Sequence, residues 1–219
     1  MTTNPNATAI LCYGDSNTWG QKPDKSGRYS VNTRWTGRLQ KQLGDDYYII
    51  EEGLGSRTTD LEYAKKPGRN GRAYLIPCLV SQSPIDLVVL MLGTNDLKIE
   101  YGRSAQDIAD AVKRLVVDIK QYAYSRSNEA PKVLIVSPIY IDGQAPDFRK
   151  FYESIYDAES VTKSHQLAEV LKRVAEETGS LFFDASTVSE AGEDGIHFNE
   201  AAHIALADAL GVKVHDNIF

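Results

Sequence analysis

Residues 9–20 read Ala-Ile-Leu-Cys-Tyr-Gly-Asp-Ser-Asn-Thr-Trp-Gly. The apolar run 9–13 predicts a buried strand, and the two glycines that bracket the following residues predict a sharp turn. A serine placed where a strand ends and the chain turns can point its hydroxyl outward, as a nucleophile requires. Ser16 has this position. Because Gly, Asp and Ser are also ordinary turn formers, the identification of a nucleophile depends on finding partners for Ser16 elsewhere in the chain.

Four further apolar runs resemble this first strand, and helical patterns separate them. The runs are 47–52, 86–92, 132–136 and 180–183, and the helical patterns cover 33–43, 104–124, 162–178 and 199–210. The runs are continuous rather than alternating, which is typical of strands covered on both faces. Strands that alternate with helices predict right-handed crossovers and a parallel sheet. We therefore expect a single α/β domain over 1–219, with three layers, α/β/α, and five parallel strands.

Composition limits the classes of function. The 219 residues are 42% hydrophobic and 25% charged, as in a globular protein, and the net charge of −6 argues against nucleic acid or an anionic membrane as the main partner. No apolar run approaches the ~20 residues of a membrane helix, and the N-terminal segment lacks the basic region of a signal peptide. Cys12 and Cys78 have no metal-ligand spacing and are expected to be small buried residues. A cytoplasmic enzyme or binding protein is the expectation.

Two segments do not fit the alternation of strands and helices. Residues 21–32 are polar and carry basic side chains, and residues 139–157 are rich in aromatic side chains. Long loops of this kind commonly form the rim of an active site or an interface, although surface decoration is an alternative for the first one. The aromatic content of the second favours a pocket wall or a contact between subunits.

The turns that follow the predicted strands carry polar groups. Ligands of parallel α/β sheets bind at the carboxyl ends of the strands, where these turns meet. A serine nucleophile needs an imidazole to take its proton, and the imidazole needs an acceptor on its other nitrogen. In the sequence Asp194-Gly-Ile-His, Asp194 can reach back to Nδ1 of His197 while Nε2 faces Ser16. This pattern predicts a Ser-His-Asp triad.

The tetrahedral intermediate of acyl transfer also needs hydrogen-bond donors for its oxyanion. Residues 53–59, Gly-Leu-Gly-Ser-Arg-Thr-Thr, form a flexible turn, and residues 93–96 read Gly-Thr-Asn-Asp. The amides of Ser16 and Ser56 and the side-chain NH₂ of Asn95 can supply three donors. We predict these three residues as the oxyanion hole.

Taken together, these blocks resemble the SGNH (GDSL-type) hydrolase superfamily. The resemblance is closest to an arylesterase and acyltransferase branch, through residues 34–37, 51–54, 57–59, 91–96 and 194–198. It implies a flavodoxin-like sheet with strand order 2-1-3-4-5, hydrolysis of short-chain esters, acyl transfer to alcohols, and homo-oligomers that include octamers. It also matches Ser16 to the nucleophile, His197 to the base, Asp194 to the acid and Asn95 to the oxyanion carboxamide. A serine, Ser56, stands where the superfamily has glycine; since only the backbone N–H is required, the serine can serve as a donor if its φ is not strongly positive.

Other residues near these blocks receive weaker predictions. Asn17, Trp19 and Ile196 are predicted to contact substrate, Ile196 by forming the floor of the acyl pocket. The remaining histidines, His165, His203 and His215, lack an acidic partner in register and are expected at the surface.

Aspartates at the strand ends allow two interpretations. Asp15 and Asp96 could join Asp194 and His197 in a metal site, but we expect them to hydrogen-bond turn amides and so shape the loops. The predicted function is thus a serine esterase that needs no cofactor or metal and acts on small, short-chain esters, acetyl esters above all. The alternatives are a carbohydrate acetylesterase, a non-catalytic acyl- or sugar-binding protein on the same fold, and a metal-dependent phosphoesterase.

Overall fold

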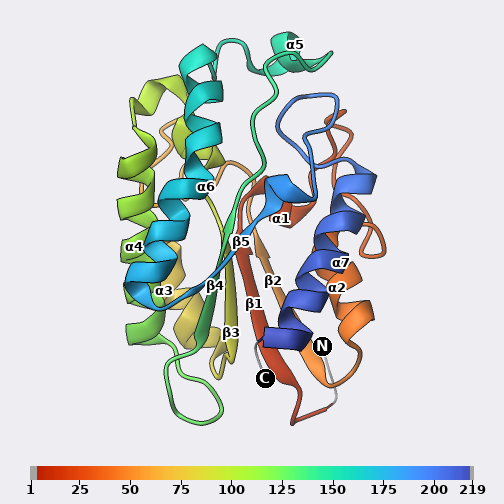
Figure 1. The fold of residues 1–219 in the computed structure, drawn as a ribbon, viewed down its shortest axis with the longest axis vertical. Coiled ribbons are helices and arrows are strands. Elements are labelled where there is room, and N and C mark those ends of the chain that lie inside the picture. The colour runs from red at the N-terminus through yellow and green to blue at the C-terminus, as the bar shows by residue number, and fades with distance from the viewer. Residues whose placement is uncertain (1–3, 218–219) are drawn as a thin grey trace.

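The sheet has five parallel strands in the order β2-β1-β3-β4-β5 in a computed structural model that describes residues 4–217 (Figure 1). The strands are β1 (Thr8–Gly14), β2 (Tyr47–Gly53), β3 (Leu87–Met91), β4 (Lys132–Ser137) and β5 (Leu181–Asp184). Each neighbouring pair is parallel. The predicted fold class and strand order are confirmed.

Helices cover both faces of this sheet. They are α1 (Ser16–Trp19), α2 (Trp35–Leu43), α3 (Gly71–Gln82), α4 (Ala105–Tyr122), α5 (Phe148–Tyr152), α6 (Ala158–Thr178) and α7 (Glu200–Asn217), with short 3-10 helices η1 (Thr94–Leu97), η2 (Ile99–Tyr101) and η3 (Ala185–Thr187). Figure 1 shows α3, α4 and α6 against one face and α2 and α7 against the other. No helix of residues 4–217 is long and apolar enough to cross a bilayer.

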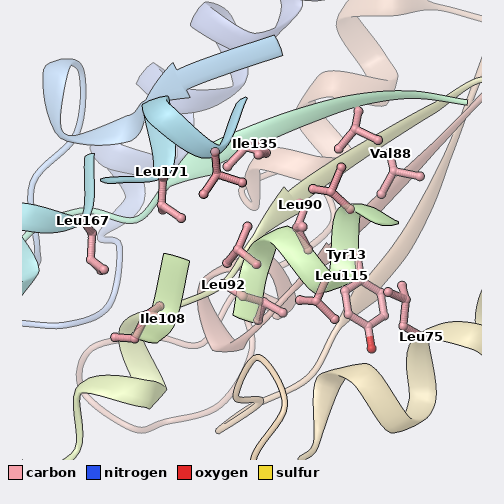
Figure 2. Close-up of a cluster of buried hydrophobic side chains, with 14 of the residues drawn as sticks. Tyr13, Leu75, Val88, Leu90, Leu92, Ile108, Leu115, Ile135, Leu167 and Leu171 are labelled. Carbon is pink, nitrogen blue, oxygen red and sulfur yellow. The ribbon is translucent and has the colours of Figure 1, made fainter. Parts of the chain in front are cut away.

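The two faces of the sheet belong to two separate apolar layers. Along β1, Ala9, Leu11 and Tyr13 point into one layer and Ile10 and Cys12 into the other. The first layer, with its packing between strands and helices, is drawn in Figure 2. A strand with apolar partners on both sides must be apolar at every position, which is why these strands show continuous runs.

Two helices extend beyond their predicted bounds: α6 begins at Ala158 instead of residue 162, and α7 ends later than predicted. The helices α3 and α5 lie outside the predicted helical patterns. The pattern 199–210 followed by Gly211 predicts a helix end, but α7 continues to Asn217. A side chain at Gly211 would overlap with the carboxamide of Gln42 on α2. Gly211 therefore faces the Gln42 side chain within the helix and does not terminate it.

The strand register places the predicted turns after β1, β2 and β3 next to one another. Gly14 at the end of β1 is aligned with Gly53 of β2 and with Met91 of β3. The segments that follow these three strands thus start side by side at the carboxyl edge of the sheet.

Candidate active site

Ser16 lies at the first position of α1, directly after β1. Asp15 precedes the helix, and its Oδ1 accepts a hydrogen bond from the amide of Asn17 at 2.9 Å. A side chain at Gly14 would overlap with the hydroxyl of Thr18, so the tight step from strand to helix requires glycine. Gly20, with a φ of +87°, ends the helix after one turn. The local sequence therefore fixes the direction of the Ser16 hydroxyl.

Ser16, His197 and Asp194 form a continuous chain of hydrogen bonds. Nε2 of His197 lies 2.8 Å from Oγ of Ser16, and Nδ1 of His197 lies 2.6 Å from Oδ2 of Asp194. All three residues are buried. With its proton on Nδ1, the imidazole donates to Asp194 and accepts the serine hydroxyl proton on Nε2. The predicted triad residues are thus brought together in the order that the chemistry requires.

Asp194 is held as a carboxylate. Its Oδ1 accepts the amides of Ile196 at 3.0 Å and His197 at 2.9 Å, in addition to the imidazole contact at Oδ2. Burial acts to raise the pKa of Asp194, but these hydrogen bonds and the charge of the His197 ring outweigh it, so the pKa lies below its ordinary value. The environment of Asp194 therefore favours its carboxylate form.

Asn17 joins the two halves of this site. Its Nδ2 donates to the carbonyl of Ile196 at 3.1 Å, and its Oδ1 accepts the amide of Phe198 at 2.9 Å. Both ends of the carboxamide are therefore engaged by the backbone on either side of His197. The position of Asn17, predicted as a substrate contact, indicates that it aligns α1 with the histidine turn.

The other two predicted substrate residues have different surroundings. Ile196 is buried in the apolar layer that contains Phe148. Trp19 is half-buried at the end of α1. Its carbonyl accepts a hydrogen bond from Nε of Arg28 at 2.6 Å, and the Arg28 guanidinium group lies over the indole ring. No substrate contact is assigned to either residue by this geometry, and their roles stay predictions.

The three predicted oxyanion donors come from the turns after β1, β2 and β3. Asn95 lies in η1, and its Nδ2 donates to Oδ2 of Asp15 at 3.3 Å, which orients the carboxamide and leaves its second N–H free to point elsewhere. The amide of Ser16 is at the start of a helix, where backbone N–H groups lack helical acceptors. Ser56 does not meet the condition set above, because its φ is +64°, in the left-handed region. The serine thus has a backbone conformation that glycine adopts without strain and that costs other residues energy.

Asp15 and Asp96 act as the structural groups that the sequence indicated. Asp96 accepts the amide and hydroxyl of Thr59, the hydroxyl at 2.5 Å, and pairs with Arg103 at 2.9 Å. It thereby ties the turn after β2 to η1. Within residues 4–217 no cluster of three or more His, Cys, Asp or Glu side chains is arranged to hold a metal ion.

Both irregular segments reach the triad, a result that the sequence did not predict at the level of residues. From 139–157, the hydroxyl of Tyr152 lies 3.3 Å from Nδ1 of His197. From 21–32, Nζ of Lys25 lies 3.7 Å from Oδ2 of Asp194. The aromatic content of the second segment was a signal for Tyr152, whereas no pattern distinguished Lys25 from other polar loop residues.

His203 corrects a prediction. It was expected at the surface but is fully buried, whereas His165 and His215 are exposed as expected. Nδ1 of His203 accepts the amide of Trp35 at 3.3 Å. The residue shares the face of α7 that packs on α2, at helical spacing from the buried Leu206.

Comparison with known proteins gives consistent results. The model of the GDSL-like lipase/acylhydrolase family matches residues 12–205. The inhibitor-bound structure of an aryl esterase from M. smegmatis is 40% identical, with a TM-score of 0.89 over 97% of this chain and 100% of that chain. A carbohydrate acetylesterase from Sinorhizobium meliloti is 38% identical, with a TM-score of 0.88 over 95% and 98%.

A curated relative is longer than this chain. The acetylxylan esterase of Xylanibacter ruminicola is 28% identical over an alignment 225 residues long that covers 95% of this chain and 43% of that protein. The chain thus spans less than half the length of that relative.

Proposed function

The chain belongs to the GDSL-like lipase/acylhydrolase family, and on this premise we propose that it is a carboxylic ester hydrolase that uses Ser16, His197 and Asp194 as a catalytic triad. The observation that carries the proposal is the pair of short contacts at His197, 2.8 Å to Ser16 and 2.6 Å to Asp194. The two contacts place nucleophile, base and orienting acid in hydrogen-bond reach of one another.

The proposed reaction begins with attack of Ser16 Oγ on the ester carbonyl carbon. Nε2 of His197 takes the hydroxyl proton, and Asp194 stabilises the imidazolium ion that forms. As the tetrahedral intermediate collapses, the imidazolium gives its proton to the leaving alcohol and an acyl-Ser16 ester remains. Water then attacks the acyl carbon with His197 again as base, the bond to Ser16 Oγ breaks, and the imidazolium returns its proton to Ser16 as the carboxylic acid leaves. In acyl transfer an alcohol takes the place of water and a new ester leaves.

The negative charge of the intermediate needs donors that are in place before reaction. We propose the amides of Ser16 and Ser56 and the free N–H of Asn95 for this role. No described residue accepts a hydrogen bond from the Ser56 amide, so this group is available to an oxyanion. Each such donor is typically worth about 3–4 kcal/mol of barrier.

The substrate is proposed to be a small acyl ester, with acetyl as the preferred acyl group. The names of the carbohydrate acetylesterase and of the acetylxylan esterase support acetyl as the acyl group, whereas the name of the aryl esterase supports an aryl ester. A second candidate is therefore deacetylation of carbohydrate, favoured by the names of the carbohydrate acetylesterase and the acetylxylan esterase described above. Rates on acetylated xylo-oligosaccharides and on p-nitrophenyl acetate distinguish the two.

The central test is the variant Ser16→Ala. We expect it to lose p-nitrophenyl acetate hydrolysis by a factor of about 10⁴–10⁶, because a triad acts as a unit. Ser26→Ala, which removes an exposed hydroxyl from the neighbouring segment, is the matched control. Native-level activity in Ser16→Ala would contradict the serine mechanism. Inhibition by chelator together with hydrolysis of p-nitrophenyl phosphate would support the phosphoesterase alternative instead.

A further inference from the structure

The segment 21–32 forms an ordered strap beside the triad. The amide of Lys22 donates to the carbonyl of Gly27, and the amide of Tyr29 donates to that of Gly20, so the segment folds back on itself. Pro23 lies against Gly192, where a side chain in place of the glycine hydrogen would overlap with it. These contacts fix the tip of the strap over the turn that carries Asp194 and His197.

Lys25, at this tip, points toward the acid of the triad. Its Nζ lies 3.7 Å from Oδ2 of Asp194, the same oxygen that contacts His197. The Lys25 side chain is 30% exposed, whereas the Asp194 side chain is 0% exposed. The ion pair therefore lies at the boundary between solvent and the buried site, where attraction is stronger than between two exposed groups.

Aromatic rings hold the ammonium group in this place. Nζ lies 3.9 Å from the centre of the Tyr152 ring and 5.1 Å from that of Phe151. Ring faces attract cations, and the two rings belong to the other irregular segment, 139–157. Lys25 also has a φ of +64°, a conformation that lysine adopts only at a cost in strain. Strain at a residue that contacts a catalytic group suggests a function for that residue.

We propose that Lys25 is a positioning residue of the triad, whose ammonium shares the Asp194 carboxylate with His197 and thereby keeps the imidazole neutral, and active as a base, at lower pH. This inference rests on the proposed function. A positive charge beside Asp194 opposes the formation of a second positive charge on the imidazole ring. The same charge decreases the affinity of the acid for a proton, so that the hydrogen bond to Nδ1 persists in acid.

Other charged or titratable groups also face the pair. Asp15 comes from the turn before α1, and its charge acts on His197 in the direction opposite to that of Lys25. Tyr152 contributes its hydroxyl from α5. His203 on α7 stays neutral because burial lowers its pKa to about 3. Burial also lowers the pKa of Lys25 from its ordinary value, with Asp194 opposing this effect. Since His203 is neutral, Lys25 is the positively charged group, among those named in this paragraph, that acts on Asp194.

The test is the pH profile of kcat/KM on p-nitrophenyl acetate for Lys25→Met, which keeps the length of the side chain but removes its charge. We expect the midpoint of the acid limb to rise by about half a unit to one unit, as for a charge removed at this distance in a partly exposed site. The ratio of variant to native kcat/KM should then be about three- to tenfold lower at pH 5 than at pH 8. Lys25→Arg, which keeps the charge, should restore the native midpoint.

Two controls separate this role from a structural one. Lys22→Met removes a charge from the same strap without a contact to Asp194 and should leave the midpoint in place. If Lys25→Met lowers kcat/KM by the same factor at every pH, the residue only packs against the site and the proposal is overturned. A lower melting temperature of Lys25→Met with an unchanged midpoint of the acid limb would also overturn the proposal.

A second measurement is independent of the reaction. In Ser16→Ala, the ring protons of His197 can be titrated by NMR with and without Lys25→Met. A titration midpoint that is higher without Lys25 supports the proposal even if Ser16 is not the nucleophile. An unchanged midpoint overturns it even if the esterase mechanism is correct. The failure of one proposal is therefore distinguishable from the failure of the other.

Discussion

His203 is a buried histidine with one satisfied nitrogen. Nδ1 accepts the amide of Trp35, while Nε2 has no partner among residues 4–217. The edges of the ring pack against Tyr29 and Phe198, with ring centres 5.2 and 5.3 Å apart. Protonation would place a charge between aromatic rings and a backbone N–H group that points at it. The site therefore strongly favours neutral imidazole.

This environment predicts a loss of stability in acid. The pKa of His203 is lowered by burial to about 3, compared with an ordinary value of 6.5. Between these two values the unfolded chain binds a proton at this residue and the native chain does not, so the free energy of unfolding decreases as the pH falls. The variant His203→Gln has no titratable group at this position, so this pH dependence is absent from its free energy of unfolding. We expect the difference in the free energy of unfolding between the native protein and this variant to shift against the native protein by about 2–3 kcal/mol from pH 7 to pH 4.

Urea denaturation at several pH values between 7 and 4 measures this difference. His215→Gln, at an exposed position on the same helix, is the control and should parallel the native protein. A constant gap between native protein and His203→Gln over this range would show that the imidazole is protonated in the fold.

The turn 192–197 is the element on which the geometry of the site depends most. Gly195 has a φ of +77°, and a side chain there would overlap with the carbonyl of Asp142 and press on Phe148. Asp142 in turn donates its amide to the carbonyl of Gly195 at 2.9 Å. Glycine is therefore required at position 195 for two separate reasons: its backbone conformation and the close approach of another segment.

A pair of glycine substitutions separates these reasons. Gly179, at the end of α6, has a φ of +61° but faces open space, so Gly179→Ala should cost only the conformational strain of about 1 kcal/mol. Gly195→Ala adds a clash with backbone and should cost about 3 kcal/mol or more. It should also lower kcat/KM at least about 100-fold, because a shift of about 1 Å misplaces His197 and Asp194. Gly179→Ala should retain activity.

Chemical denaturation and steady-state kinetics of both variants check this prediction. Equal losses of stability and activity in the two variants would mean that the approach of Asp142 to Gly195 does not constrain the turn.

The elements that could be predicted from the sequence are those whose formation depends on local pattern. Continuous apolar runs located all five strands, and the helical pattern 104–124 located α4. The extent of α7 beyond Gly211 could not be predicted, because a glycine directly after a helical pattern is a common helix end. The folding of 21–32 over the triad depends on contacts that have no local pattern, such as Pro23 on Gly192.

The site, too, has residues that could be predicted from local pattern and residues that could not. The chemical types of Ser16, Asp194, His197 and Asn95 could be recognised because they follow strands, and parallel strands bring their carboxyl ends together. The left-handed conformation of Ser56 and the approach of Lys25 to Asp194 depend on how several loops pack on one another. The functional roles of these residues stay predictions that the variants above test.

The last prediction concerns the assembly of the whole molecule. The resemblance implies homo-oligomers, octamers among them, and large apolar side chains more than half exposed are consistent with surfaces that another copy covers: Val80 on α3, Val117 on α4 and Val212 on α7. Covering such side chains stabilises an assembly by about 25 cal/mol per Å² of apolar area.

We therefore expect light scattering after size-exclusion chromatography to give a multiple of the 24.3 kDa chain mass at micromolar concentration. Glutamate at Val80 or Val212, on opposite faces of the sheet, should reduce this mass where the face forms a contact, with Gln106→Glu as an exposed control. A mass of 24.3 kDa at every concentration would contradict the prediction, and the segment 139–157 would then border the active site without joining subunits.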